Sequence, residues 1–300
     1  MEFEPIECCK LEYNKEIMSN NELSSVEICG IVNINSEQAV NKANYDNYFD
    51  LILKYNIPVF YCNDVNDLDS IDFIKDKNPD IIIQSGWSQK FKAELLSIPK
   101  YGCIGEHPAP LPRGRGAACV NWAILTGETA WGESFFKMVN EYDKGDIYAQ
   151  KFFDIDINDD VKTVYDKVSS SASEIVRENI VNWCSGKFNV IKQDESLVTY
   201  YKRRKPDDGL FDFSMSNIDT YNHIRAQARP YPGAFFILDG KKYFVWKAKL
   251  TDIETVEKAG SFIGTTDSGG IYAACGDGKV IELLRVQQEG KPEQWGSEVF

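Results

Sequence analysis

The chain contains only two histidines, and each can be weighed as a general acid or base near neutral pH. His107 stands at the end of an expected strand that begins at residues 102–104, and Pro-Ala-Pro-Leu-Pro-Arg-Gly-Arg-Gly follows it. Prolines and glycines constrain an unusual loop there, and open α/β sheets form their sites beyond the carboxyl ends of the strands. His107 is therefore a candidate general base. His223 lies in an expected helix, where a surface or interfacial role is the more frequent one.

Asp143 is the carboxylate that could work with this histidine. It lies in the turn Glu-Tyr-Asp-Lys-Gly-Asp between two expected strands, 134–139 and 147–155. An aspartate before Lys-Gly most often forms the turn itself. A carboxylate close to a histidine can also orient the ring and raise its pKa. From the residues alone, both roles stay open.

Alternating strands and helices are expected to position these two residues. Apolar runs predict strands at 26–33, 58–62 and 80–84. Helical periodicity and end signals predict helices at 43–55, 68–77, 91–98, 116–126 and 159–185. This order predicts an α/β fold with a Rossmann-like, doubly wound, mostly parallel sheet over residues 1–190.

The pattern changes near residue 190. Residues 191–208 are polar and are expected to be a linker. Over 209–300, strands alternate with glycine-rich turns, and Asp239-Gly240 and Asp277-Gly278 are typical of hairpins. We expect a smaller C-terminal β-rich domain, OB-like in character.

Composition excludes several classes of protein. The net charge of −13 disfavours a nucleic-acid partner, because phosphate contacts need clustered lysine and arginine. The sequence has no apolar run of 18 residues and no early apolar signal core, so we expect a cytoplasmic protein without membrane contact. The eight cysteines include no Cys-x-x-Cys pair, which predicts free thiols and no metal site.

Three runs, at 107–116, 121–129 and 142–147, resemble the signature of the folate-dependent formyltransferases. This family includes methionyl-tRNA formyltransferase, glycinamide ribonucleotide formyltransferase and the nucleotide-sugar N-formyltransferases. The interval of 36 residues between His107 and Asp143 (143 − 107) matches the family pattern. Segments 202–209 and 225–235 resemble the start of the second domain in the tRNA and sugar branches. The resemblance covers roughly residues 26–295 and disfavours the purine-pathway enzymes.

The resemblance implies a role for each motif. His107 would shuttle protons between the attacking amine and the folate nitrogen, and Asp143 would hold it. The co-substrate would be 10-formyltetrahydrofolate, with no metal. A homodimer through the second domain is also implied. The folate pocket is expected to involve, largely through backbone groups, Gln89, Lys90, Phe91, Val139, Asn140, Glu141 and Tyr142.

Two features depart from the family pattern. Most members have Asn-x-His, in which the asparagine polarises the formyl carbonyl, whereas this chain has Gly105 at that position of the substrate site. Loss of such a donor can slow a reaction about 100-fold or more. Another donor, a slower enzyme or a non-catalytic binding module are the three alternatives. In addition, Phe3–Cys9 carries three glutamates and makes a poor first strand, so the chain is either truncated or irregular at its start.

The amine is expected to belong to a nucleotide-linked amino sugar of the kind used in lipopolysaccharide or O-antigen biosynthesis. The acidic charge and the runs Gly-Trp-Ser-Gln and Gly-Arg-Gly resemble the sugar branch more than the tRNA branch. Arginine matches phosphate oxygens, so Arg203, Arg204, Arg225 and Arg229 are candidates for the diphosphate, although each could equally be a surface charge. Methionyl-tRNA formylation is the alternative.

Overall fold

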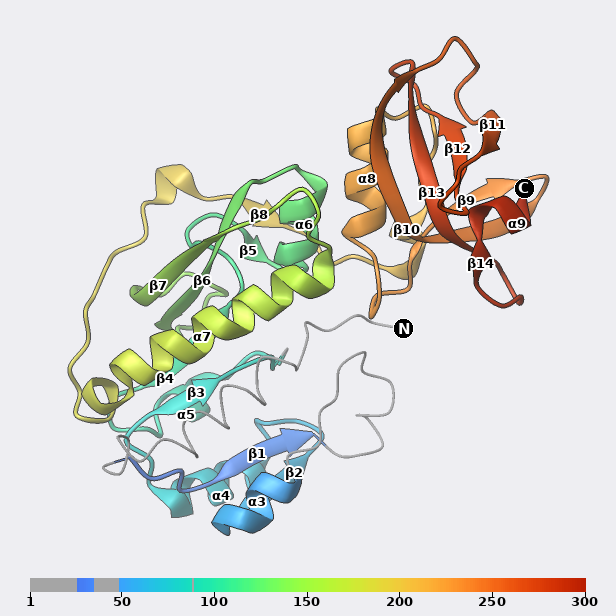
Figure 1. The fold of residues 1–300 in the computed structure, drawn as a ribbon. Coiled ribbons are helices and arrows are strands. Elements are labelled where there is room, and N and C mark those ends of the chain that lie inside the picture. Colours follow the sequence, from blue (N-terminus) through green and yellow to red (C-terminus); the bar gives the residue numbers. More distant parts are fainter. Residues whose placement is uncertain (1–25, 35–48, 88) are drawn as a thin grey trace.

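The computed structural model describes residues 26–34, 49–87 and 89–300, and Figure 1 shows two domains. The N-terminal domain contains the sheet and the long helix α7 (Val161–Cys184), and the C-terminal domain contains α8 (Asn217–Arg225), which packs against its sheet. Residues 3–9, which the sequence indicates to be a poor first strand, fall outside the described residues.

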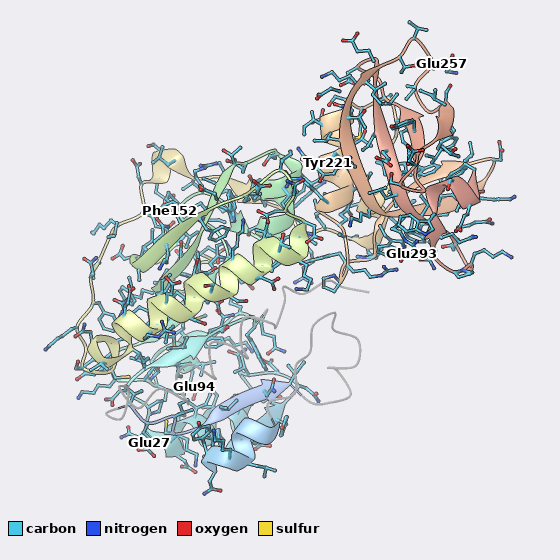
Figure 2. The ribbon with its side chains drawn as sticks, viewed as in Figure 1. Glu27, Glu94, Phe152, Tyr221, Glu257 and Glu293 are labelled. Carbon is cyan, nitrogen blue, oxygen red and sulfur yellow. The ribbon has the colours of Figure 1, made fainter. Side chains whose placement is uncertain are left out.

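A four-stranded sheet forms the centre of the N-terminal domain. Its order is β3-β4-β6-β7, in which β3 and β4 are parallel and the remaining pairs are antiparallel. Phe152 is labelled on the outer strand β7 in Figure 2. The strand bounds are Ile82–Gln84, Cys103–His107, Ala130–Lys137 and Ile147–Asp154.

Helices cover both faces of this sheet. On one face α7 packs its apolar side on Ile104 and Phe135, which are both fully buried. Asp160 caps α7 by accepting a hydrogen bond from the Thr163 amide, and this satisfies one of the free donors of the first turn. On the other face Leu95 belongs to a core formed with α4 and α5. These two helices span Leu68–Lys77 and Ala93–Leu96.

The first two described strands form a separate sheet. β1 (Ile31–Ile34) pairs in parallel with β2 (Val59–Cys62), and α3 (Phe49–Tyr55) connects to β2. Among the described strands, no pairing joins β1 to β3. A cavity of about 250 Å³ lies between them, lined by Ile31–Asn33 on one side and Ile81–Ser85 on the other.

The C-terminal domain is built on an antiparallel sheet of order β11-β12-β13-β10-β9, with β14 paired to β13. Phe236 and Phe213 belong to its core. The hairpins at Asp239-Gly240 and Asp277-Gly278 are present. The strand bounds are Ala234–Leu238, Lys241–Glu254, Phe262–Thr265, Ile271–Ala274, Lys279–Gln288 and Gln294–Trp295, and α9 spans Gly296–Val299.

The two domains are joined by a buried arginine. Arg225, on α8, donates from Nη1 to the backbone oxygens of Asp156 and Asp159, at 3.1 and 2.8 Å. Tyr221 of the same helix lies at the junction of the domains in Figure 2, whereas Glu293 lies on the outer part of the C-terminal domain. The predicted phosphate ligand Arg225 is therefore part of the packing between domains.

The predicted fold class, α/β followed by a β-rich domain, is confirmed. The boundaries differ in detail. The strand predicted from residue 26 begins at Ile31, where pairing with β2 begins. The helix predicted from residue 116 begins at Cys119, because residues 115–116 form β5 and pair instead with Tyr200–Tyr201 (β8). The helix predicted at 43–55 is described only from Phe49.

Candidate active site

A pocket of about 380 Å³ opens at the carboxyl ends of β3 and β4. Segments far apart in the chain form its wall: the loop after β3, the end of β4, the start of α6 (Cys119–Leu125), the loop after β6, and β8. The pocket is lined, among others, by Gln84, Trp87, His107, Cys119, Phe136, Met138, Tyr142, Asp143, Tyr201 and Arg203.

His107 is the last residue of β4, and its side chain is 8% exposed. Its Nε2 lies 2.8 Å from the Gly114 carbonyl oxygen, which can only accept, so Nε2 carries a hydrogen. The Cys119 sulfur lies 3.4 Å from the same nitrogen and donates to the same carbonyl at 3.0 Å. The remaining ring nitrogen, Nδ1, lies 3.9 Å from Oδ1 of Asp143.

Asp143 occupies the turn between β6 and β7 with a left-handed backbone, at φ 57°. Its second oxygen, Oδ2, accepts a hydrogen bond from the Gly116 amide at 2.8 Å. This bond fixes the carboxylate, and the 3.9 Å separation is longer than a direct hydrogen bond to the ring. Gly114 and Cys119 make the closest polar contacts to the ring, and the orienting role of Asp143 stays a prediction.

The surroundings of His107 favour its charged form. Burial by itself lowers the pKa of the ring, but the neighbouring Cys119 sulfur and Asp143 carboxylate outweigh burial and raise the pKa to about 10. The ring is therefore an imidazolium at neutral pH, with Nδ1–H directed at the pocket. A protonated ring can act as an acid or as a hydrogen-bond donor to a developing anion.

Residues 191–208, which were predicted as a linker, support the turn that contains Asp143. Gln193 donates from Nε2 to the backbone oxygens of Asp143 and Gly145, both at 2.7 Å. Its Oε1 accepts from the fully buried Arg115. Gly116 has φ 105°, and a Cβ there would lie 2.2 Å from the Tyr201 carbonyl oxygen, so only glycine allows β5 and β8 to approach this closely.

Most of the predicted folate residues gather at this pocket. Gln89, Lys90, Phe91, Val139, Glu141 and Tyr142 line it, whereas Asn140 does not. The Gln89 side chain bridges two loops, since it accepts from the Val65 amide and donates to the Asn63 carbonyl. The Lys90 ammonium lies 5.6 Å from the centre of the exposed Tyr142 ring.

Gly105 has no free space above it. A Cβ at this position would lie 2.8 Å from two ring carbons of Phe136 and 3.1 Å from Met138. These contacts are too short for an unshifted structure. The aromatic ring therefore occupies the volume that a side chain at position 105 would need.

Of the arginines predicted as phosphate ligands, Arg203 and Arg204 lie at or near the pocket. Arg203 lines the main pocket and also a small neighbouring cavity of about 30 Å³, which Arg204 and Lys205 share. Arg204 stacks over Trp122 at 5.1 Å and donates to the Asp208 carbonyl.

Arg229 and His223, two further candidates, line neither the main pocket nor the small cavity. Arg229 pairs with Glu293 on the C-terminal domain. His223 contacts the Gly209 carbonyl at 3.3 Å, and burial lowers its pKa to about 4. Within the described ranges, no helix has the length and apolar character needed to cross a membrane, and no three potential ligands cluster to hold a metal.

The sequence reasoning missed Cys119, Gly114 and Gln193. Cys119 was one of eight scattered cysteines with no motif, and Gln193 lies 50 residues after Asp143 in a polar segment. Spacing gives no signal for contacts of this kind. A run of small residues before the helix, Gly-Ala-Ala-Cys, was the one available sign of a close approach.

The structure places a histidine at the end of β4 and an aspartate in the turn after β6 at one pocket of an α/β domain, and this is the candidate active site. The family model described as formyl transferase matches residues 24–180, and that of the formyl transferase C-terminal domain matches residues 203–300. This chain belongs to the formyl transferase family and is a formyltransferase.

Relatives from both branches of the family resemble the chain. Methionyl-tRNA formyltransferase of Bacillus subtilis is 31% identical over 246 residues, which cover 82% of this chain and 77% of that protein. The bifunctional polymyxin resistance protein ArnA of Wigglesworthia glossinidia brevipalpis is 32% identical, and the chain covers 35% of its length. The crystal structure of WlaRD, a sugar 3N-formyl transferase, aligns over 97% of both chains with 18% identity and a TM-score of 0.68, which shows a shared fold.

Proposed function

We propose that this enzyme transfers a formyl group from 10-formyltetrahydrofolate to the amine of a nucleotide-linked amino sugar. The observation that carries the proposal is the pairing of His107 Nδ1 with the Asp143 carboxylate at the floor of an open pocket. The relative WlaRD is named as a sugar formyl transferase, and its structure was determined with dTDP and 5-N-formyl-THF. The predicted folate segments line the pocket in this chain.

The geometry supports a division of labour between the two residues. As the amine attacks the formyl carbon, Asp143 accepts the amine proton. The protonated His107 ring donates from Nδ1 to the folate nitrogen while the carbon–nitrogen bond to the formyl group breaks. The proton on Asp143 then passes to Nδ1, which restores both groups. Holding the two substrates together in one pocket supplies much of the acceleration.

The basic rim favours a phosphate-bearing acceptor. Arg203 lies between the main pocket and the small cavity, and Arg204 and Lys205 extend the positive charge. Asn121 also lines this cavity, and its buried Oδ1 has no hydrogen-bond partner in the described structure. We expect Arg203→Gln to raise the KM for the nucleotide sugar about tenfold, while Lys162→Gln, on the surface of α7, leaves it unchanged.

Methionyl-tRNA formylation is the second candidate, because methionyl-tRNA formyltransferases are 30–33% identical over about four fifths of the chain. The net charge of −13 argues against it. The test is formyl transfer from 10-formyltetrahydrofolate to a panel of amino-sugar nucleotides and, in parallel, to methionyl-tRNA. Turnover with a sugar nucleotide supports the first proposal, and turnover with the tRNA alone replaces it.

A further inference from the structure

The pocket contains a carboxamide that takes no part in the proton transfers of His107 and Asp143. Gln84 is the last residue of β3, and it lines the pocket together with His107. It is the register partner of Gly105 on the parallel neighbour β4. Gly105 in turn pairs with Phe136 on β6. Glutamine, glycine and phenylalanine therefore form one row across three strands.

This row lies on the same face of the sheet as the catalytic histidine. Side chains alternate along a strand, so position 105 and His107 share a face, and cross-strand partners share it as well. Ile82 and Cys103 lie two residues before Gln84 and Gly105 and therefore share their face, and they pack on the α4 and α5 side. The Gln84 carboxamide thus stands one strand away from the histidine, at the level of Gly105.

Formyl transfer requires a hydrogen-bond donor near the formyl oxygen, and this row of residues contains one. When the amine attacks, the formyl oxygen becomes an oxyanion, and a preorganised N–H donor stabilises it. Gly105 provides no side chain, and the Phe136 ring occupies the space of one. Because the Nδ1–H of His107 serves the folate nitrogen in the proposed transfer, a second side-chain donor on this face has to come from a neighbouring strand.

The Gln84 amide is already held in place. Its Nε2 donates to the Trp87 carbonyl oxygen at 2.5 Å. A carboxamide nitrogen carries two hydrogens, so the second one is available to a ligand. The first bond fixes the orientation of the amide before the substrate arrives, and this preorganisation makes an oxyanion donor effective.

We propose that Gln84 is a catalytic residue of this enzyme and that its side-chain N–H donates to the oxyanion formed from the formyl group. The inference rests on the proposed function, since it assumes a formyl donor in this pocket. In this proposal the oxyanion donor comes from β3, because β4 has a glycine at the corresponding position. The Phe136 ring can therefore cover Gly105 while the oxyanion is still stabilised.

The test compares kcat and KM of wild type with Gln84→Met, which keeps the length of the side chain but removes the donor. We expect kcat to fall about 100-fold while KM for the formyl donor stays within about threefold, because the interaction strengthens only in the transition state. Gln287→Met, on the C-terminal domain, is the matched control and retains wild-type kcat. A Gln84→Met enzyme within threefold of wild-type kcat overturns the inference and leaves the proposed function intact.

Two further measurements keep the test decisive. In the Gln84→Met background, Gly105→Asn combined with Phe136→Ala places an amide on β4 instead, and we expect part of the lost kcat to return. If wild type formylates no acceptor, the proposed function fails, and hydrolysis of 10-formyltetrahydrofolate to tetrahydrofolate and formate then tests Gln84 directly, because attack by water also forms the oxyanion. We expect this hydrolysis to be about 100-fold slower in Gln84→Met than in wild type. Equal rates in the two proteins, or no hydrolysis by wild type above the uncatalysed rate, overturn the inference.

Discussion

Two cavities lie on either side of β3, and the residues around them are held in different ways. The pocket around His107 is formed by side chains and carbonyls that hydrogen-bond to one another. The cavity between β1 and β3 is lined mainly by apolar side chains, among them Ile83, Phe73 and Ile180. Gln84 and Trp87 belong to both linings.

The difference shows where this fold is rigid. On its β4 side, β3 is held by main-chain pairing. On its β1 side, among the described strands, only side chains lie against it. Directional bonds fix atoms for chemistry, whereas apolar packing contributes stability without fixing one geometry. We therefore expect substitutions of the hydrogen-bonding residues around His107 to change rates, and truncation of an apolar residue beside the second cavity to lower stability modestly without changing rates.

Replacing the histidine gives the largest expected effect on rate. His107→Ala removes the proton donor of the pocket, and we expect kcat to fall about 1000-fold, within the range for general acid–base catalysis. His223→Gln is the matched control, because His223 lines neither the main pocket nor the small cavity and its ring nitrogen contacts the Gly209 carbonyl. The measurement is formyl transfer at pH 7.5. Equal losses in both variants would show that the pocket is not the reaction centre.

Asp143→Asn tests the charge while keeping the shape. The asparagine oxygen can still accept the Gly116 amide, so the turn should remain intact. Without the negative charge, the amine proton has no acceptor and the His107 ring loses an anionic neighbour. We expect kcat to fall about 100-fold, and Asp146→Asn, in the same turn, to retain activity. A fully active Asp143→Asn enzyme would assign the base to another group.

Sequence patterns predicted that His107 and Asp143 belong to one site, but not the contacts around them. His107 and Asp143 lie in motifs with a fixed interval, and the order of strands and helices predicts that they end at one edge of the sheet. Cys119 and Gln193 reach the same site only through the folded chain. A single sequence contains the propensity of each segment, and it does not record which distant carbonyl a glutamine will bind.

The loss of stability on truncation should differ between the β4 core and the cavity on the β1 side of β3. Ile104 on β4 is fully buried, and Ile83 on β3 is partly buried beside the apolar cavity. We expect Ile104→Ala to lower the free energy of unfolding by about 3 kcal/mol and Ile83→Ala by about 1 kcal/mol, because little new cavity forms where one already exists. Urea denaturation measures both. Equal losses would mean that the space between β1 and β3 is filled in solution.

Stability should also depend on pH through the catalytic ring. The folded-state pKa of His107, about 10, lies above the ordinary value of 6.5. The bound proton therefore contributes stability that is complete below pH 6.5 and is lost as the pH rises through 10. We expect the urea midpoint of wild type to fall between pH 6.5 and 10, and to fall less in His107→Gln. Parallel curves for the two proteins would contradict the raised pKa.

The smallest expected effect is a shift in one titration, and the chain is well suited to reveal it. With two histidines, imidazole NMR signals should show one ring that titrates near pH 4, His223, and one near pH 10, His107. Cys119→Ala removes the sulfur 3.4 Å from His107 Nε2, and we expect the higher pKa to fall by on the order of one unit while the lower one stays in place. Cys275→Ala, in the core of the second domain, should move neither. If Cys119→Ala leaves the His107 titration unchanged, Asp143 alone sustains the charge on the ring, and the sulfur only fills space beside it.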